Sequence, residues 1–106
     1  MEQKYILSNG FPEIEDVKTL LNAITLYGRT AQTDIAIEEM SELTKAILKL
    51  RRADGEKYFK ARNDLIDEIA DVLVCTKQLL IIYDCYSEVS ERMEFKVQRL
   101  KKRMEG

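Results

Sequence analysis

The chain has very few residues that interrupt helices, with four glycines and one proline among its 106 residues. Charged residues make up 34% of the sequence, against about 25% in an average domain. Scarce turn residues and abundant charge together favour long, solvated helices over a turn-rich β fold. The length corresponds to one domain over residues 1–106, with a core small enough that self-association is expected to complete it.

Four helices are predicted from the spacing of apolar residues and from capping residues. Pro12 is expected to begin the first helix and Gly28 to end it. A loop is expected over residues 55–60, and Ser87 is expected to cap the last helix. After a lead-in segment over residues 1–11, the predicted helices span about 12–27, 30–54, 61–84 and 87–104. The predicted architecture is all-α and four-helix-bundle-like.

Histidine is absent, and this excludes several kinds of active site. A histidine general base, a histidine-ligated zinc site, a Ser-His-Asp triad and the Glu-x-x-His di-iron motif are all ruled out. Cys75 and Cys85 are too few for a disulfide framework and are interpreted as buried, reduced thiols. The formal net charge of -2 carries no signal for a nucleic-acid partner.

The second predicted helix carries an acidic pair beside its apolar stripe. Glu39 and Glu42 lie on one flank of this stripe when positions are counted at about 100° per residue, and Glu38 lies further towards solvent. The stripe consists of Ala36, Met40, Leu43, Ile47 and Leu50.

The third predicted helix repeats the pattern. Glu68 and Asp71 lie on the same flank of its stripe, and further along that flank come Cys75 and Ile82, which indicates a buried surface. The stripe consists of Leu65, Ile69, Val72, Thr76 and Leu79. If the two helices pack antiparallel, they can bring all four acidic residues together.

Ionised carboxylates buried together cost several kcal/mol each unless a positive group joins them. A divalent cation resolves this conflict, and the oxygen-only ligand set fits Mg²⁺, with Mn²⁺ as the alternative, rather than zinc or copper. The predicted metal ligands are Glu39, Glu42, Glu68 and Asp71. The competing interpretation is a solvated acidic face that pairs with lysine.

Both half-motifs match a known signature. Residues 37–43 (Ile-Glu-Glu-Met-Ser-Glu-Leu) and 67–73 (Asp-Glu-Ile-Ala-Asp-Val-Leu) fit the pattern Glu-Glu-x-x-Glu … Glu-x-x-Asp. Over about residues 25–104 the chain resembles the MazG-like nucleoside triphosphate pyrophosphohydrolases of the all-α NTP pyrophosphatase superfamily. The resemblance implies Mg²⁺-dependent hydrolysis of a nucleoside or deoxynucleoside triphosphate to the monophosphate and pyrophosphate, in nucleotide-pool control.

The same resemblance implies roles for individual residues. It makes Glu38 a catalytic candidate beside Glu39, either for a further metal ion or for orienting the attacking water. It suggests Gln32 as a pocket residue, and Lys96 and Arg103 as phosphate-facing residues. Lys49 is a further phosphate candidate because it lies on the acidic flank of the second helix.

The expected partners are a nucleoside triphosphate and further copies of the chain, as a homodimer or homotetramer. The third helix is expected in the interface because Leu73, Leu80 and Ile81 lie off its main stripe. No membrane-spanning segment and no signal peptide are predicted, so a cytoplasmic location is expected. Two alternatives stay open: a nucleotide- or metal-binding module without turnover, and a structural helical oligomer.

Overall fold

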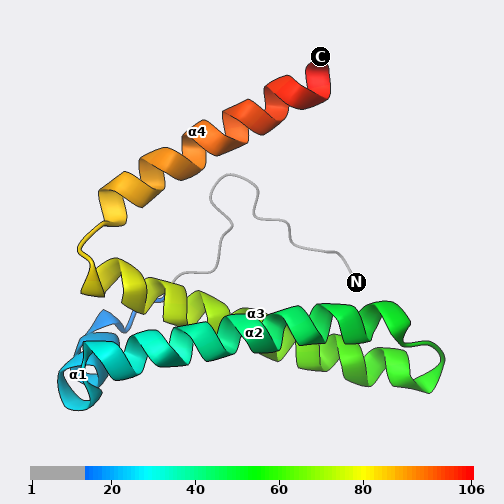
Figure 1. The fold of residues 1–106 in the computed structure, drawn as a ribbon, viewed down its shortest axis with the longest axis horizontal. Helices are drawn as coiled ribbons and strands as arrows, with labels where there is room; N and C mark the ends of the chain where they lie inside the picture. The colour runs from blue at the N-terminus through cyan, green and yellow to red at the C-terminus, as the bar shows by residue number, and fades with distance from the viewer. Residues whose placement is uncertain (1–13) are drawn as a thin grey trace.

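A computed structural model describes residues 14–106, which form four helices joined by short connections (Figure 1). The helices are α1 (Val17–Tyr27), α2 (Arg29–Arg52), α3 (Glu56–Ile82) and α4 (Tyr86–Glu105). No strand occurs in this part of the chain, so the all-α prediction is confirmed. Nor is any helix within residues 14–106 both long and apolar enough to cross a membrane.

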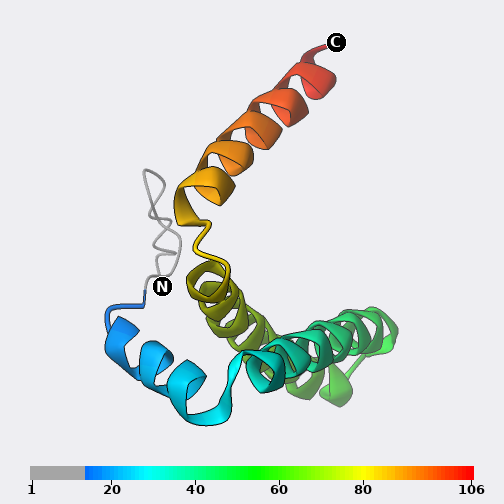
Figure 2. The same ribbon diagram turned by 60° about the vertical axis from the view of Figure 1, so that its left-hand side comes forward.

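The centre of the fold is an antiparallel hairpin of α2 and α3 (Figures 1 and 2). Only residues 53–55 connect the two helices, and Gly55 takes a positive φ of 59° there. The expected loop over 55–60 is therefore wrong. Tyr58 and Phe59 lie in the first turns of α3, where their rings pack edge to face with centres 5.5 Å apart.

The start of α1 also differs from the prediction. The helix begins at Val17, and residues 14–16 before it are not helical, so a start at Pro12 is wrong; Pro12 itself lies outside the described residues. Asp16 is the cap, because its carboxylate accepts hydrogen bonds from the Thr19 hydroxyl at 2.8 Å and the Thr19 backbone N–H at 3.1 Å. These two bonds lower the pKa of Asp16.

Gly28 ends α1 as predicted and lets the chain turn directly into α2. Its φ of 94° and ψ of 157° lie in a region that is essentially restricted to glycine. The next residue, Arg29, begins α2 at the end of the hairpin opposite the 53–55 connection. Its guanidinium donates a hydrogen bond of 3.0 Å to the carbonyl of Ile82, the last residue of α3. This bond satisfies a carbonyl in the last turn of α3 and links the start of α2 to the end of α3.

The surface that α2 and α3 share differs from the predicted apolar stripes. On α2, Met40 and Ile47 are about two-fifths exposed, and the buried residues are Gln32, Ala36 and Ala46. On α3 the buried residues are Ala61, Cys75, Gln78 and Ile82. Counted at 100° per residue, the real contact line lies about 40° from the predicted stripe on α2 and about 90° on α3, in both cases towards the acidic flank.

The last helix diverges from the rest of the molecule (Figures 1 and 2). Within the described chain α4 approaches α3 near their junction and contacts neither α1 nor α2. It begins at Tyr86 after Cys85 with no side-chain cap, so the prediction of Ser87 as the cap is wrong. The part of the chain that the structure describes is thus all-α, but its four helices do not close into one bundle.

We expect Gly28→Ala to lower the free energy of unfolding by about 1–3 kcal/mol, because alanine is strained in this backbone conformation. A Cβ at this position would meet no atom within 4 Å, so the loss measures backbone strain and not a clash. Urea unfolding followed by circular dichroism gives the value. Gly106→Ala is the matched control and should leave stability unchanged; equal losses in both variants would contradict the explanation.

Candidate metal centre

Three carboxylates converge halfway along the α2–α3 hairpin. One oxygen each from Glu39 on α2 and from Glu68 and Asp71 on α3 lies within 4.8 Å of the other two. Glu39 and Glu68 are half-buried and Asp71 is exposed. The three residues are called the acidic trio below. They come together because the contact line of the hairpin is rotated towards the acidic flank of both helices.

Glu68 has the least favourable environment of the three. Its Oε1 atom is buried and has no hydrogen-bond partner among the described residues. Burial raises the pKa of Glu68 above its ordinary value, and the neighbouring carboxylates of Glu39, Asp71 and Glu42 raise it further. The trio therefore favours either a retained proton or a bound cation.

Glu42, the fourth predicted ligand, lies beside the trio and not within it. Its carboxylate pairs with the Lys45 ammonium group at 3.4 Å, one turn further along α2. It nevertheless contributes to the raised pKa of Glu68 and lines the same groove as Glu68. The structure thus brings three of the four predicted ligands together and places the fourth next to them.

Two open grooves lie between the acidic trio and the α2–α3 turn, and the first of them is lined by Glu68. The first has a volume of about 430 Å³ and the second of about 450 Å³. Lys49, Arg52 and Asp64 line both grooves, so the two adjoin. The other lining side chains that carry charge are Glu42, Lys45, Asp67 and Glu68 in the first groove, and Lys57 and Lys60 in the second.

The cations of these grooves differ in how they are paired. Lys45 pairs with Glu42, and Lys60 pairs with Asp64 at 3.0 Å. Lys49 and Arg52 form no ion pair with any of residues 14–106. Sequence reasoning selected Lys49 but missed the groove as a unit. The available signal was the spacing of Lys45, Lys49 and Arg52, which puts all three on the helix face that carries Glu42.

The remaining predicted site residues lie apart from the trio or are buried. Glu38 is exposed on α2, as its position in the sequence suggested. Gln32 is 5% exposed and lies in the core near the Arg29 end of the hairpin. Lys96 and Arg103 are exposed on the diverging helix α4, and they do not line either groove.

Sequence reasoning gave Cys75 no role beyond that of a buried thiol, and the structure places it next to the trio. Cys75 follows Asp71 by about one turn and is only 5% exposed. Burial, and then the charges of Glu39 and Asp71, raise the pKa of the Cys75 thiol. The neutral thiol lets the hairpin pack closely beside the carboxylates without adding another negative charge. Cys85 is half-buried and also free.

The chemistry of the donor set fits a hard divalent cation. All the groups offered by the trio are carboxylate oxygens, the ligands that Mg²⁺ and Mn²⁺ prefer. A cation here would also neutralise the charges that raise the pKa of Glu68 and would give its buried oxygen a partner. The neighbouring Lys49 and Arg52 add positive charge suited to an anion, such as a phosphate group.

Comparisons of the chain with protein-family models, with curated proteins and with solved structures found no match.

Without divalent cations, we expect Glu68 to make stability depend on pH in a defined direction. Because its pKa is raised in the folded chain, its stabilising contribution is present below the ordinary glutamate pKa and is lost as the pH rises through the folded value. Glu68→Gln removes this loss. The stability of the Glu68→Gln variant relative to the parent chain should therefore be higher at about pH 7.5 than at about pH 4.

Thermal unfolding with a chelator present measures this difference at the two pH values. Glu91→Gln, on the exposed surface of α4, is the control and should show no comparable change. A Glu68→Gln variant whose relative stability is the same at both pH values would contradict the assignment of the raised pKa to Glu68.

Proposed function

We propose that the chain is a Mg²⁺-dependent nucleoside triphosphate pyrophosphohydrolase that releases pyrophosphate and a monophosphate. The observation that carries this proposal is the acidic trio, in which Glu39, Glu68 and Asp71 approach within 4.8 Å and one Glu68 oxygen is buried without a partner. The trio is formed by the two half-motifs on which the resemblance to the MazG-like enzymes rests. A solvated acidic face would not leave a carboxylate oxygen buried and unpaired.

The proposed metal ligands are Glu39, Glu68 and Asp71, with Glu42 available from the neighbouring turn of α2. A bound Mg²⁺ ion would supply charge neutralisation on the triphosphate and a lower pKa for a coordinated water. The protein's own contribution is to hold the carboxylates in place from two helices in fixed register. Glu38, exposed on α2, keeps its proposed catalytic role, either in holding a further metal ion or in orienting the attacking water.

The basic residues of the adjoining groove are proposed to bind the phosphate groups of the triphosphate. Lys49 and Arg52 lie on the same groove as Glu68 and have no ion pair within residues 14–106, so their charges are available to an anion. Positioning and electrostatic stabilisation supply most of the catalysis in phosphoryl transfer. This geometry favours Lys49 over Lys96 and Arg103 as the phosphate-binding cation within one chain, because the latter two lie on the diverging α4.

A metal-dependent rise in melting temperature is the first expected result. At a Mn²⁺ or Mg²⁺ concentration of about a hundred times Kd, the gain in free energy of unfolding is about 2.7 kcal/mol. For a domain near this size the gain corresponds to a rise of roughly 10–20 °C. Glu39→Gln and Glu68→Gln should each abolish most of the rise, and Glu91→Gln should retain it. Equal rises in all four proteins would assign the metal to another place, and no rise in any would favour a structural helical oligomer.

Turnover is tested with a panel of nucleoside and deoxynucleoside triphosphates in the presence of Mg²⁺. We expect pyrophosphate and a nucleoside monophosphate as products, with activity reduced at least about a hundredfold by Glu39→Gln or Glu68→Gln. Orthophosphate as the only product would refute this reaction class. Tight triphosphate binding with no turnover would instead identify the chain as a binding module.

On the best substrate of the panel, Lys49→Ala should raise KM about tenfold or more, because a charged hydrogen bond to phosphate is lost. The variant should keep the full metal-dependent rise in melting temperature, since Lys49 is not a metal ligand. Lys102→Ala, at the exposed end of α4, is the matched control and should behave like the parent chain.

A further inference from the structure

Helix α3 carries a second apolar face, opposite the face that packs against α2. Ile66, Leu73 and Leu80 lie on this second face. At about 100° per residue they lie about 170° around the helix from Cys75 and Ile82, which are buried on the hairpin side. Ile66 is 46% exposed. Within residues 14–106, the hairpin therefore leaves one apolar face of its longer helix uncovered.

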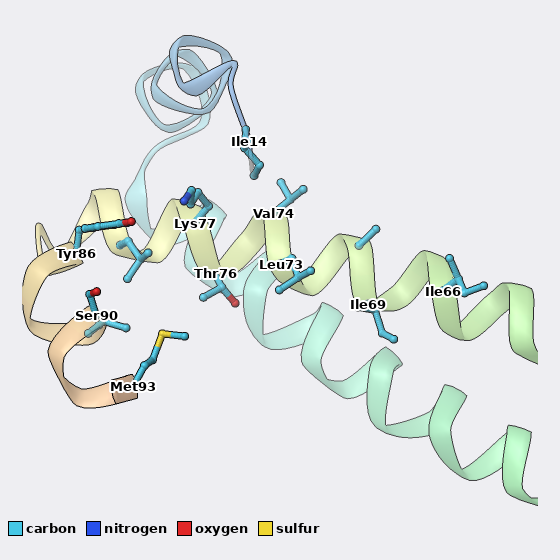
Figure 3. Close-up of a pocket in the computed structure, with 13 residues that line it drawn as sticks. Ile14, Ile66, Ile69, Leu73, Val74, Thr76, Lys77, Tyr86, Ser90 and Met93 are labelled. Carbon is cyan, nitrogen blue, oxygen red and sulfur yellow. The ribbon is translucent and has the colours of Figure 1, made fainter. Parts of the chain in front are cut away.

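This face forms one wall of an apolar groove with a volume of about 600 Å³ (Figure 3). The start of α4 forms another wall, with Tyr86 and Met93. Apart from Lys77, all the side chains that line the groove are uncharged. Lys77 lies over the ring of Tyr86, with its ammonium group 5.3 Å from the ring centre. Such a groove is suited to an apolar, uncharged occupant.

The described part of the chain begins at this groove. Ile14, the first described residue, lines the groove, and Figure 3 shows its side chain pointing toward Val74 of α3. Asp16, two residues later, caps α1 through Thr19, and this cap fixes where the chain enters the helix. Residues 1–13 are therefore joined to the rest of the chain at the groove itself.

The sequence before Ile14 has the composition of a groove occupant. Residues 5–12 carry no charge, whereas charged residues make up 34% of the whole chain. The large apolar residues among them form two groups, residues 5–7 (Tyr-Ile-Leu) and then Phe11. Segments that stay in solvent are typically poor in aromatic and branched apolar residues. This segment therefore has apolar side chains to bury and no charges that must stay in water.

The segment is also long enough to extend along the groove. At about 3.3 Å per extended residue, Phe11 can lie up to about 10 Å from Ile14, and Leu7 up to about 23 Å. The α3 wall from Ile66 to Leu80 is about 21 Å long, at about 1.5 Å per residue. Both apolar groups of the segment can therefore lie in the groove.

Covalent attachment favours this segment over any separate molecule. A segment joined to its site by a short link is present at an effective concentration of about 1 mM, whereas another copy of the chain or another protein competes at its free concentration. A modest affinity of the segment for the groove is therefore enough to fill it.

We propose that residues 5–11 occupy the groove between α3 and α4 of their own chain, with Phe11 and residues 5–7 packed against the apolar face of α3. The segment then covers the face of α3 that α2 leaves open. It also supports α4, which within residues 14–106 contacts α3 only near their junction. The groove lies on the side of α3 away from the acidic trio, so this inference is independent of the proposed enzymatic function.

Tryptophan fluorescence tests the proposal, because the chain contains no tryptophan and an introduced one reports on the segment alone. Phe11→Trp in the full chain should emit at a shorter wavelength than in the urea-unfolded chain and should resist quenching by acrylamide. Leu7→Trp repeats the measurement at the other apolar group. Emission and quenching equal to those of the unfolded chain in both variants would overturn the proposal.

Variants of the groove wall show whether the introduced tryptophan lies in the groove. Val74→Glu and Ile66→Glu place a charge at positions that are 40% and 46% exposed, so each should keep its helix content by circular dichroism. Each should shift the emission to longer wavelength and increase quenching. The matched control is Ile37→Glu on α2, at a 64% exposed position away from the groove, and it should change neither. A tryptophan that stays protected in both wall variants would contradict docking in this groove.

A mixing experiment separates the chain's own groove from the groove of a second copy. The double variant Phe11→Trp, Val74→Glu has the fluorescent reporter and an altered groove, whereas the parent chain has an intact groove and no tryptophan. The two are unfolded in urea and refolded together with the parent chain in excess. The emission should stay at long wavelength, because the segment binds within its own chain. Recovery of the short-wavelength emission would show docking in another copy and would refute the proposal. Loss of triphosphate hydrolysis in any variant bears on the proposed function and not on this result.

Discussion

The packing of α2 against α3 determines both the fold and the candidate site. Small residues such as Ala36, Ala46 and Ala61 line this contact and let the helices approach closely. Close approach on this side brings Glu39, Glu68 and Asp71 together, although their charges repel one another. The hairpin therefore holds a local conflict between packing and electrostatics. Such conflicts are typical of binding sites, because a ligand that relieves them gains affinity from the strain that it removes.

The existence of the four helices could be predicted from the sequence, but not all of their ends. The end of α1 could be predicted because the backbone conformation at Gly28 needs glycine. The start of α1 could not be predicted in this way, because Pro12 followed by acidic residues resembles the first turn of a helix. The actual N-cap is Asp16, which accepts hydrogen bonds from Thr19. The short turn before α3 was also missed, since Tyr58 and Phe59 have no strong helical preference and are placed by packing on each other.

The acidic residues of the site were predictable, and the reason for their convergence was not. Periodicity favoured the largest apolar residues, so Met40 and Ile47 were assigned to the core on α2. In the structure the hairpin packs through smaller residues and leaves both of those side chains about two-fifths exposed. Which face of a helix meets its neighbour depends on how closely two backbones can approach, and this is a property of the pair. The contact face therefore cannot be predicted from the sequence of one helix alone.

The position of Cys75 affects how readily its thiol is oxidised. Peroxides and alkylating reagents attack the thiolate form of cysteine. Burial and the neighbouring carboxylates hold the pKa of Cys75 above its ordinary value, so its sulfur stays protonated and is shielded from these reagents. Burial beside the acidic trio, together with the charges of Glu39 and Asp71, thus disfavours the reactive thiolate form of Cys75.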